Sequence, residues 1–147
     1  MRSILTIGHS NRTAEAFLRL LRAHGVTAVA DVRSTPFSKR TEWARKRPLE
    51  ALLREAGIGY LFMGEALGGM PPAPEAERIA AVERVIAGLE RHRIALMCAE
   101  ADPRRCHRGH LLAPLFLARG VDVRHIRDGG RALPHDEAGI ATQAALF

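Results

Sequence analysis

The sequence has 147 residues, of which 47% are hydrophobic and 26% charged, and a formal net charge of +6. This length fits one domain, and we expect a single α/β domain over residues 1–147. No apolar run approaches the ~18 residues that span a bilayer, and the N-terminus lacks the apolar core of a signal peptide. Two cysteines are too few for a disulfide framework. We therefore expect a cytoplasmic protein that does not associate with membranes and whose cysteines are thiols, metal ligands or a redox pair.

Short apolar strands alternate with amphipathic helices along the chain. In the first helix, Ala14, Phe17, Leu18 and Leu21 recur at the spacing of a packed helical face. Pro114 should kink or break the last helix, because proline lacks the backbone N–H. The last twenty or so residues are predicted to be irregular. The predicted strands cover residues 4–7, 26–32, 58–63, 94–98 and 121–126, and the predicted helices cover 13–24, 48–57, 75–92 and 106–119.

Strands that alternate with helices predict a three-layer α/β/α fold around a five-stranded, mainly parallel sheet. Right-handed crossovers place the strand-to-helix loops at one edge of such a sheet, where ligands bind. Polar motifs follow the first, second and fourth strands. We favour the strand order 3-2-1-4-5, because the order 2-1-3-4-5 would place the third strand between the fourth and the first two.

The densest polar motif runs from the end of the fourth strand into the last helix, from Cys98 through Glu100 and Cys106 to His107 and Arg108. A helix start favours an anion or a thiolate. Cys106, among several arginines, is therefore a candidate for a thiol of low pKa, and Cys98 is the other candidate nucleophile. The alternative for each cysteine is a small buried apolar side chain.

The spacing from Cys98 to Arg104 also matches the C-x5-R phosphate loop of cysteine phosphatases. Such a loop binds phosphate through successive backbone N–H groups. Here Pro103 lacks one of these donors, and Glu100 and Asp102 would repel phosphate. We interpret the match as coincidental.

Two shorter motifs follow the first and second strands. His9 can act as an acid, a base or a ligand, although a surface histidine beside a helix-capping Ser10 explains the same residues. Asp31 and Arg33 point to the same side of their strand. A carboxylate in an apolar strand needs a partner, so an internal pair of Asp31 with an arginine is the structural alternative to a role at the site.

The loop from Arg33 to Arg47 holds six basic residues and one acid, and it includes Phe37 and Trp43. Aromatic rings stack on bases while arginines contact phosphates, so this loop is the candidate for nucleic-acid binding. The alternative is a solvated loop with both aromatic rings folded beneath it. Gly68 and Gly69 form a turn that would allow a ligand to approach the backbone.

The sequence supports a metal site less well than it supports the other chemical hypotheses. His107 and His110 lie three residues apart, and His9, Cys98 and Cys106 could add ligands, but no tight C-x2-C or H-x3-H spacing exists. We predict no metal and no cofactor. The other histidines are expected at the surface or at helix ends: His24, His92, His125 and His135.

These motifs together resemble the bacterial and archaeal family called domain of unknown function 488. The resemblance rests on residues 6–10, on Asp31-Val32-Arg33 with Pro36 and Ser38, on Leu67-Gly68-Gly69, and on Cys98, Glu100, Asp102-Pro103 and Cys106-His107-Arg108. It spans nearly the whole chain and implies that these motif residues form a shared site. Ala101 departs from the lysine that is frequent in the family, so no role of that lysine transfers. The resemblance supplies no activity.

Our leading hypothesis is an enzyme, a cysteine-dependent hydrolase or transferase, that acts on a small anionic or nucleic-acid-borne substrate. Two alternatives remain: a non-catalytic nucleic-acid-binding protein that uses the loop from Arg33 to Arg47, and a metal-binding module. A homodimer is also left open. The expected catalytic residues are Cys98, Glu100, Cys106, His107 and His9, and the expected anion-binding residues are Ser10, Asp31, Arg33, Arg108, Gly68 and Gly69.

Overall fold

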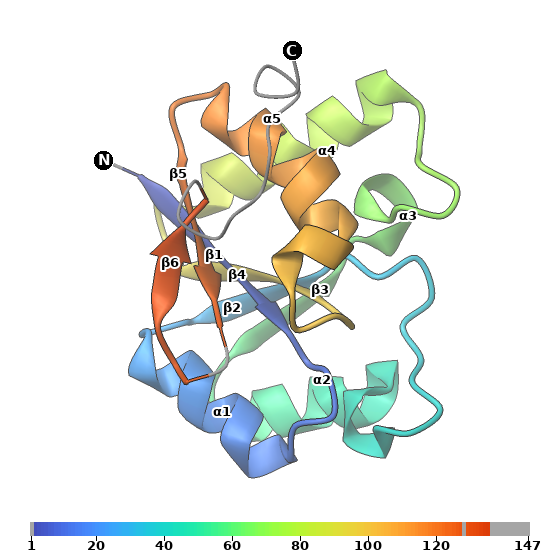
Figure 1. Ribbon diagram of the computed structural model, residues 1–147, viewed down its shortest axis with the longest axis vertical. Coiled ribbons are helices and arrows are strands. Elements are labelled where there is room, and N and C mark those ends of the chain that lie inside the picture. The colour runs from blue at the N-terminus through green and yellow to red at the C-terminus, as the bar shows by residue number, and fades with distance from the viewer. Residues whose placement is uncertain (1, 128, 136–147) are drawn as a thin grey trace.

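A computed structural model describes residues 2–127 and 129–135, and within these ranges six strands form one sheet in the order β3-β2-β4-β1-β5-β6 (Figure 1). The sheet is parallel from β3 to β5, whereas β6 runs antiparallel to β5. The strands are β1 (Ser3–Gly8), β2 (Ala28–Asp31), β3 (Gly59–Phe62), β4 (Ile94–Cys98), β5 (Asp122–Ile126) and β6 (Ala132–Pro134).

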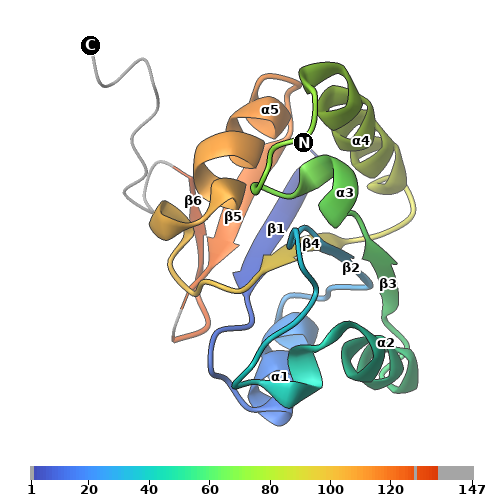
Figure 2. The same cartoon turned by 90° about the vertical axis from the view of Figure 1, so that its right-hand side faces the viewer.

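Helices cover both faces of the sheet, as Figure 2 shows, and produce the three layers expected from the sequence. The helices α1 and α2 pack on one face, and α3, α4 and α5 pack on the other. The α-helices are α1 (Ala14–Ala23), α2 (Lys46–Glu55), α3 (Gly64–Leu67), α4 (Glu75–Gly88) and α5 (Ala113–Leu117), and shorter turns are the 3₁₀ segments η1 (Glu42–Ala44) and η2 (Pro103–Arg105) and the π-helical η3 (Arg108–Leu112).

The predicted strand order is wrong in one detail, because β4 lies between β2 and β1 rather than beyond β1. Ala95 of β4 is in register with Leu5 on one side and with Val29 on the other. All five residues of β4 are buried, as a strand covered on both faces and paired on both sides requires. Hydrophobic periodicity identifies such a strand, but it does not specify which strands pair with it.

This order gives the sheet a switch point beside β4. The chain leaves β1 toward β2 on one side, and it leaves β4 toward β5 on the other side. In open α/β sheets, the loops that diverge in this way leave a crevice at the carboxyl ends of the strands. The ends of β1, β2 and β4 are therefore neighbours at this edge.

The C-terminal prediction is wrong for Ala132–Pro134, because these residues form β6 on the edge of β5. The part of that prediction that concerns Asp128 and residues 136–147 lies outside the described residues. The last helix was predicted to kink or break at Pro114, but it is not interrupted there and instead changes its winding just before the proline. The π-helical turn η3 precedes α5, and Pro114 occupies the first turn of α5, where a missing N–H is tolerated.

No helix in the described ranges is both long enough and apolar enough to cross a membrane.

A candidate active site at the carboxyl edge of the sheet

The loops after β1 and β4 are joined at the edge of the sheet by backbone hydrogen bonds. The His9 N–H donates to the Cys98 carbonyl at 2.9 Å, and the Ser10 N–H donates to the Ala99 carbonyl at 2.8 Å. The next part of the β4 loop crosses directly over Gly8, where a Cβ atom would lie 1.7 Å from the Glu100 carbonyl oxygen. The two loops can therefore approach this closely only because residue 8 is a glycine.

A cavity of about 580 Å³ opens at this edge beside both cysteines. It collects six of the predicted site residues from three separate chain segments. His9, Ser10, Asp31, Gly68 and Arg108 are not among its lining residues. The cavity is lined by Arg33, Ser34, Thr35, Gly69, Met70, Cys98, Ala99, Glu100, Arg105, Cys106 and His107.

Arg108 lies beneath the cavity and is fully buried. Its Nε donates to Thr6 Oγ1 at 3.0 Å, and its Nη1 donates to the sulfur of Cys98 and to the Glu100 carbonyl, both at 2.6 Å. Its Nη2 donates to the Ala101 carbonyl at 3.0 Å. All three guanidinium nitrogens are thus bonded to the protein, so Arg108 acts on the site through Cys98 and the β4 loop.

The positive charge of Arg108 has no carboxylate partner in the described part of the chain. A buried charge without a counter-charge is strongly unfavourable. Among the described residues, the only group that accepts a hydrogen bond from the Arg108 guanidinium and can become an anion is the thiol of Cys98, which lies next to Cys106. The negative charge that compensates Arg108 is therefore expected on the cysteine pair.

Of the two cysteines, Cys106 carries this negative charge. The neighbouring thiol of Cys98 lowers the pKa of Cys106 well below its usual range, and the contacts with His107 and Arg108 add to this effect against the opposing effect of burial. Burial and the nearby Cys106 raise the pKa of Cys98. These opposite shifts make Cys106 the thiolate of the pair at neutral pH, while the thiol of Cys98 donates to the Glu100 carbonyl at 3.6 Å.

The imidazole of His107 lies beside Cys106 and lines the cavity. Its Nε2 lies 2.9 Å from the Val32 carbonyl, which can only accept, so Nε2 carries a proton. Its Nδ1 faces the sulfur of Cys106 at 3.6 Å. Burial lowers the pKa of His107, but the hydrogen bond and charge of Cys106 together with the carbonyls of Val32 and Leu67 outweigh it, and the net pKa is raised. Gly69 permits this packing, because a Cβ there would lie 3.0 Å from the imidazole Cγ.

Asp31 and Arg33 form a two-pronged ion pair at the end of β2, with distances of 2.9 and 2.7 Å. The Tyr60 hydroxyl donates to the same carboxylate at 2.7 Å. This is the internal pair that the sequence offered as an alternative for Asp31. It leaves Nη1 of Arg33 buried and without a partner among the described residues, although Arg33 lines the cavity.

His9 and Ser10 lie in the loop after β1 and do not line the cavity. Nδ1 of His9 donates to the Ser10 carbonyl at 2.9 Å, and burial lowers the pKa of His9. Ser10 adopts a φ of +47°, and Thr13 rather than Ser10 caps α1 by accepting from the Ala16 N–H at 3.1 Å. Glu100 exposes its side chain at the rim of the cavity. At Gly68 a Cβ would lie 2.5 Å from Ser34 Oγ, so the absence of a side chain here lets the backbone pack closely against Ser34, which lines the cavity.

A buried hydrogen-bonded chain behind Arg108 was missed by the sequence analysis. Thr6 accepts from Arg108, and its hydroxyl also hydrogen-bonds to Nδ1 of His125 at 2.6 Å. Nε2 of His125 hydrogen-bonds to Nδ1 of His135 at 3.0 Å. Burial and the charge of Arg108 lower the pKa of His125 to about 3, so it is neutral. The expectation that His125 and His135 lie at the surface is wrong, and a threonine within an apolar strand was the available signal.

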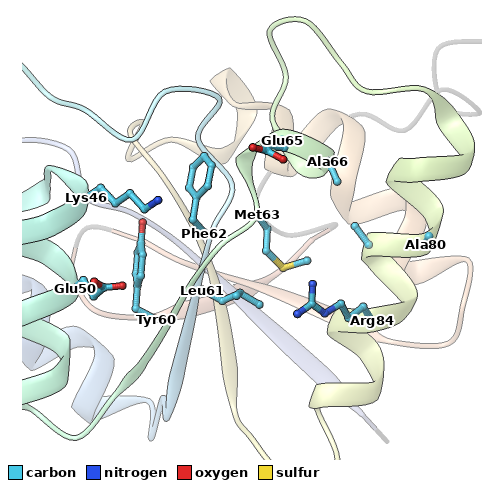
Figure 3. Close-up of a pocket in the computed structure, with 11 residues that line it drawn as sticks. Lys46, Glu50, Tyr60, Leu61, Phe62, Met63, Glu65, Ala66, Ala80 and Arg84 are labelled. Atoms are coloured by element: carbon cyan, nitrogen blue, oxygen red, sulfur yellow. The ribbon is translucent and has the colours of Figure 1, made fainter.

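A second groove of about 600 Å³ runs along β3 between α2 and α4 (Figure 3). The figure shows Lys46 and Glu50 reaching from α2 and Arg84 reaching from α4. Lys46, Glu65 and Arg84 are exposed, and no cysteine or histidine lines this groove. It has room for a ligand but no nucleophile, so the candidate active site is the cavity beside the cysteines.

Three further features of the sequence can be located in the structure: the C-x5-R match, the basic loop and the candidate metal ligands. Arg104, the arginine of the C-x5-R match, pairs with Asp102 at 2.9 Å. In the basic loop, Trp43 is folded inward and donates to the Arg12 carbonyl at 2.9 Å, whereas Phe37 is 55% exposed. Within residues 2–127 and 129–135, no group of three or more histidine, cysteine or acidic side chains is placed to hold a metal ion.

The fold and the site define a three-layer α/β protein with a buried thiol pair at the switch point of its sheet. The chain belongs to the family described as domain of unknown function DUF488, which matches residues 13–78 and 72–115. These ranges include both cysteines, His107, Arg108 and the Asp31–Arg33 pair. No curated protein and no solved structure matches the chain.

Proposed function

We propose that this protein is an enzyme that uses the Cys106 thiolate as a nucleophile on a small anionic substrate, as a cysteine-dependent hydrolase or transferase. The observation that carries the proposal is the fully buried, carboxylate-free guanidinium of Arg108 in contact with Cys98. A thiolate held near neutral pH by a positive field and an adjacent imidazole is the arrangement that nucleophilic catalysis by cysteine requires.

Three features of the cavity favour an anionic substrate. Arg33 presents a buried Nη1 without a protein partner, and a substrate oxygen would satisfy this donor. Arg105 adds an exposed positive charge to the same lining. His107 can return a proton from Nδ1 to a leaving group, which assigns it the general-acid role. Glu100, at the rim, is then the candidate base for a second, water-dependent step.

Alkylation by iodoacetamide tests the nucleophile. We expect Cys106 to react roughly fivefold faster than a free cysteine at about pH 6, because the larger thiolate fraction outweighs the lower intrinsic reactivity of a thiolate with a low pKa. Mass mapping should place the label on Cys106, and Cys106→Ser should abolish it. Labelling no faster than that of a free cysteine would overturn the proposal.

A charged reagent tests the substrate class. Iodoacetate carries a carboxylate and iodoacetamide does not, so the ratio of their rates at Cys106 reports the preference of the cavity for an anion. Arg105→Gln should lower this ratio about threefold, because one nearby positive charge is lost. Arg104→Gln is the matched control: it removes a neighbouring exposed arginine that does not line the cavity. An equal ratio in both variants would contradict an anion-binding role for the cavity.

The basic loop supports a second candidate function, the binding of single-stranded nucleic acid. Phe37 is 55% exposed, and the guanidinium of Arg45 lies 4.6 Å from its ring centre. Lys39 and Arg40 are exposed on the same loop, and Arg47 is exposed in the first turn of α2. An exposed ring among cations fits base stacking with phosphate contacts. Binding of a fluorescent oligonucleotide should weaken with salt and with Phe37→Ala, and the absence of binding at low salt would remove this function.

A further inference from the structure

We propose that Cys98 is a resolving thiol, so that the cysteine pair reduces an anionic disulfide and closes into an intramolecular disulfide. This inference rests on the proposed function, because it needs Cys106 as the attacking group. It goes further in naming the substrate class and in giving Cys98 a chemical role. The two cysteines line one cavity and pack in the same buried cluster.

The geometry gives the two cysteines unequal positions. Cys106 is 6% exposed and contacts the imidazole of His107, whereas Cys98 is 2% exposed and accepts a hydrogen bond from the buried Arg108. An incoming disulfide would therefore meet Cys106 first. Cys98 lines the same cavity and belongs to the same buried cluster as the sulfur that would become the mixed disulfide, close enough for each thiol to shift the pKa of the other. A second thiol in this position resolves such an intermediate without a large movement of the chain.

The chemical steps balance as two thiol–disulfide exchanges. The Cys106 thiolate attacks one sulfur of R–S–S–R, which forms the mixed disulfide Cys106–S–S–R and releases R–S⁻. Cys98 then loses its proton, attacks the Cys106 sulfur and releases the second R–S⁻. The proton from Cys98 passes to one released thiolate, so the products are the Cys98–Cys106 disulfide, R–SH and R–S⁻. The substrate gains two electrons and the protein thiol pair loses them.

The buried arginine makes this disulfide unstable relative to the thiols. Oxidation removes the thiolate of the cysteine pair, whose Cys98 sulfur Arg108 contacts, and so leaves the charge of Arg108 uncompensated among the described residues. A reduced form that is stabilised by a thiolate makes a dithiol pair a strong oxidant once it is closed. The disulfide therefore belongs to the labile, catalytic kind, in contrast to structural disulfides, which stabilise a fold.

The cavity also favours a particular charge on the disulfide. Arg33, Arg105 and His107 lie among its lining residues, and Glu100 is the only acid among them. A disulfide with carboxylate groups should therefore react faster than a neutral one. This preference connects the exchange chemistry to the anion site proposed above.

Dithiobis(nitrobenzoic acid), an anionic disulfide that releases a coloured thiolate, provides the test on the full-length protein. We expect the wild type to release two equivalents of the coloured thiolate and to retain none, so that its mass falls by two hydrogen atoms. Cys98→Ser should release one equivalent and retain the other group on Cys106. Hydroxyethyl disulfide, which is neutral, should react at least several-fold more slowly with the wild type.

The outcomes separate this inference from the proposed function. A wild type that reacts quickly at Cys106 but keeps the nitrobenzoate group would overturn the resolving role and leave the nucleophile intact. A wild type that does not react at Cys106 would overturn both. Urea unfolding adds a readout that requires no variant. The oxidised protein should unfold at lower urea than the reduced protein, and a higher midpoint for the oxidised protein would contradict the inference.

Discussion

The cavity beside the cysteines and the groove along β3 have nearly equal volumes but different chemistry. The cavity beside the cysteines, about 580 Å³, is backed by buried polar groups: Arg108, Asp31 and Arg33 are each at most 5% exposed. The groove along β3, about 600 Å³, carries its charges on exposed Lys46, Glu65 and Arg84 (Figure 3). Solvated charges need no partner, whereas buried charges require one. The volume of an opening therefore does not identify a functional site, whereas the way in which its buried charges are paired does.

Replacing one arginine in each region should show the largest contrast. Arg108→Met removes the donor for Thr6, for Cys98 and for two carbonyls. We expect the free energy of unfolding to fall by about 4 kcal/mol, because these acceptors stay buried without partners. Arg84→Gln, in the groove, should change it by less than about 0.5 kcal/mol. Urea denaturation measures both, and equal effects would remove the distinction between the two regions.

The buried histidine behind Arg108 should make the protein sensitive to acid. The unfolded chain binds a proton at His125 near its ordinary pKa of 6.5, but in the folded protein its pKa is about 3. Stability should therefore fall as the pH drops below 6.5, by about 3 kcal/mol at about pH 4.

His125→Gln should flatten this dependence, because glutamine keeps an acceptor for Thr6 and a donor for His135 but does not titrate. The free energy of unfolding should be compared between the wild type and the variant across this pH range. Parallel curves would show that His125 is not the group responsible.

Two strand glycines provide the next comparison. Gly8→Ala would place a methyl group 1.7 Å from the Glu100 carbonyl oxygen, so we expect a loss of about 2–3 kcal/mol and slower alkylation of Cys106. At Gly59 in β3, the nearest atom to the added methyl group is Ala28 Cβ at 3.6 Å, an ordinary contact. Gly59→Ala should change neither property appreciably. A tolerated Gly8→Ala would show that the β4 loop does not cross where the structure places it.

The smallest expected effect concerns the imidazole beside the thiolate. As the pH falls through the lowered pKa of Cys106, the thiolate is protonated and alkylation slows. His107→Gln removes the positive partner, so the midpoint of the rate profile should move upward by about one pH unit. His110→Gln, three residues further on and outside the cavity lining, should leave the midpoint unchanged.

The sequence predicted the five parallel strands and the edge of the sheet where the site lies, because apolar periodicity and right-handed crossovers depend on local patterns. It also showed that Asp31 would need a partner. It did not predict that β4 separates β1 from β2, or that β6 extends the sheet. Strand pairing is decided by contacts between distant segments, which a single sequence does not display.

The same reason explains what was missed within the site. Arg108 was expected to hold an anion, but the structure directs it to Thr6, 102 residues earlier, and to Cys98. Thr6 is in turn 119 residues from His125. The residue types in the motif indicated cysteine chemistry, but only the fold shows that a buried positive charge stands behind the thiols.

The proposed chemistry depends on a thiolate that balances the charge of Arg108. Ultraviolet absorbance of the reduced protein, followed against pH, measures this thiolate. We predict one thiolate per chain at about pH 6, present in the wild type and absent in Cys106→Ser. A protein whose thiolate absorbance appears only near the ordinary cysteine pKa, at about pH 8.5, would contradict the account.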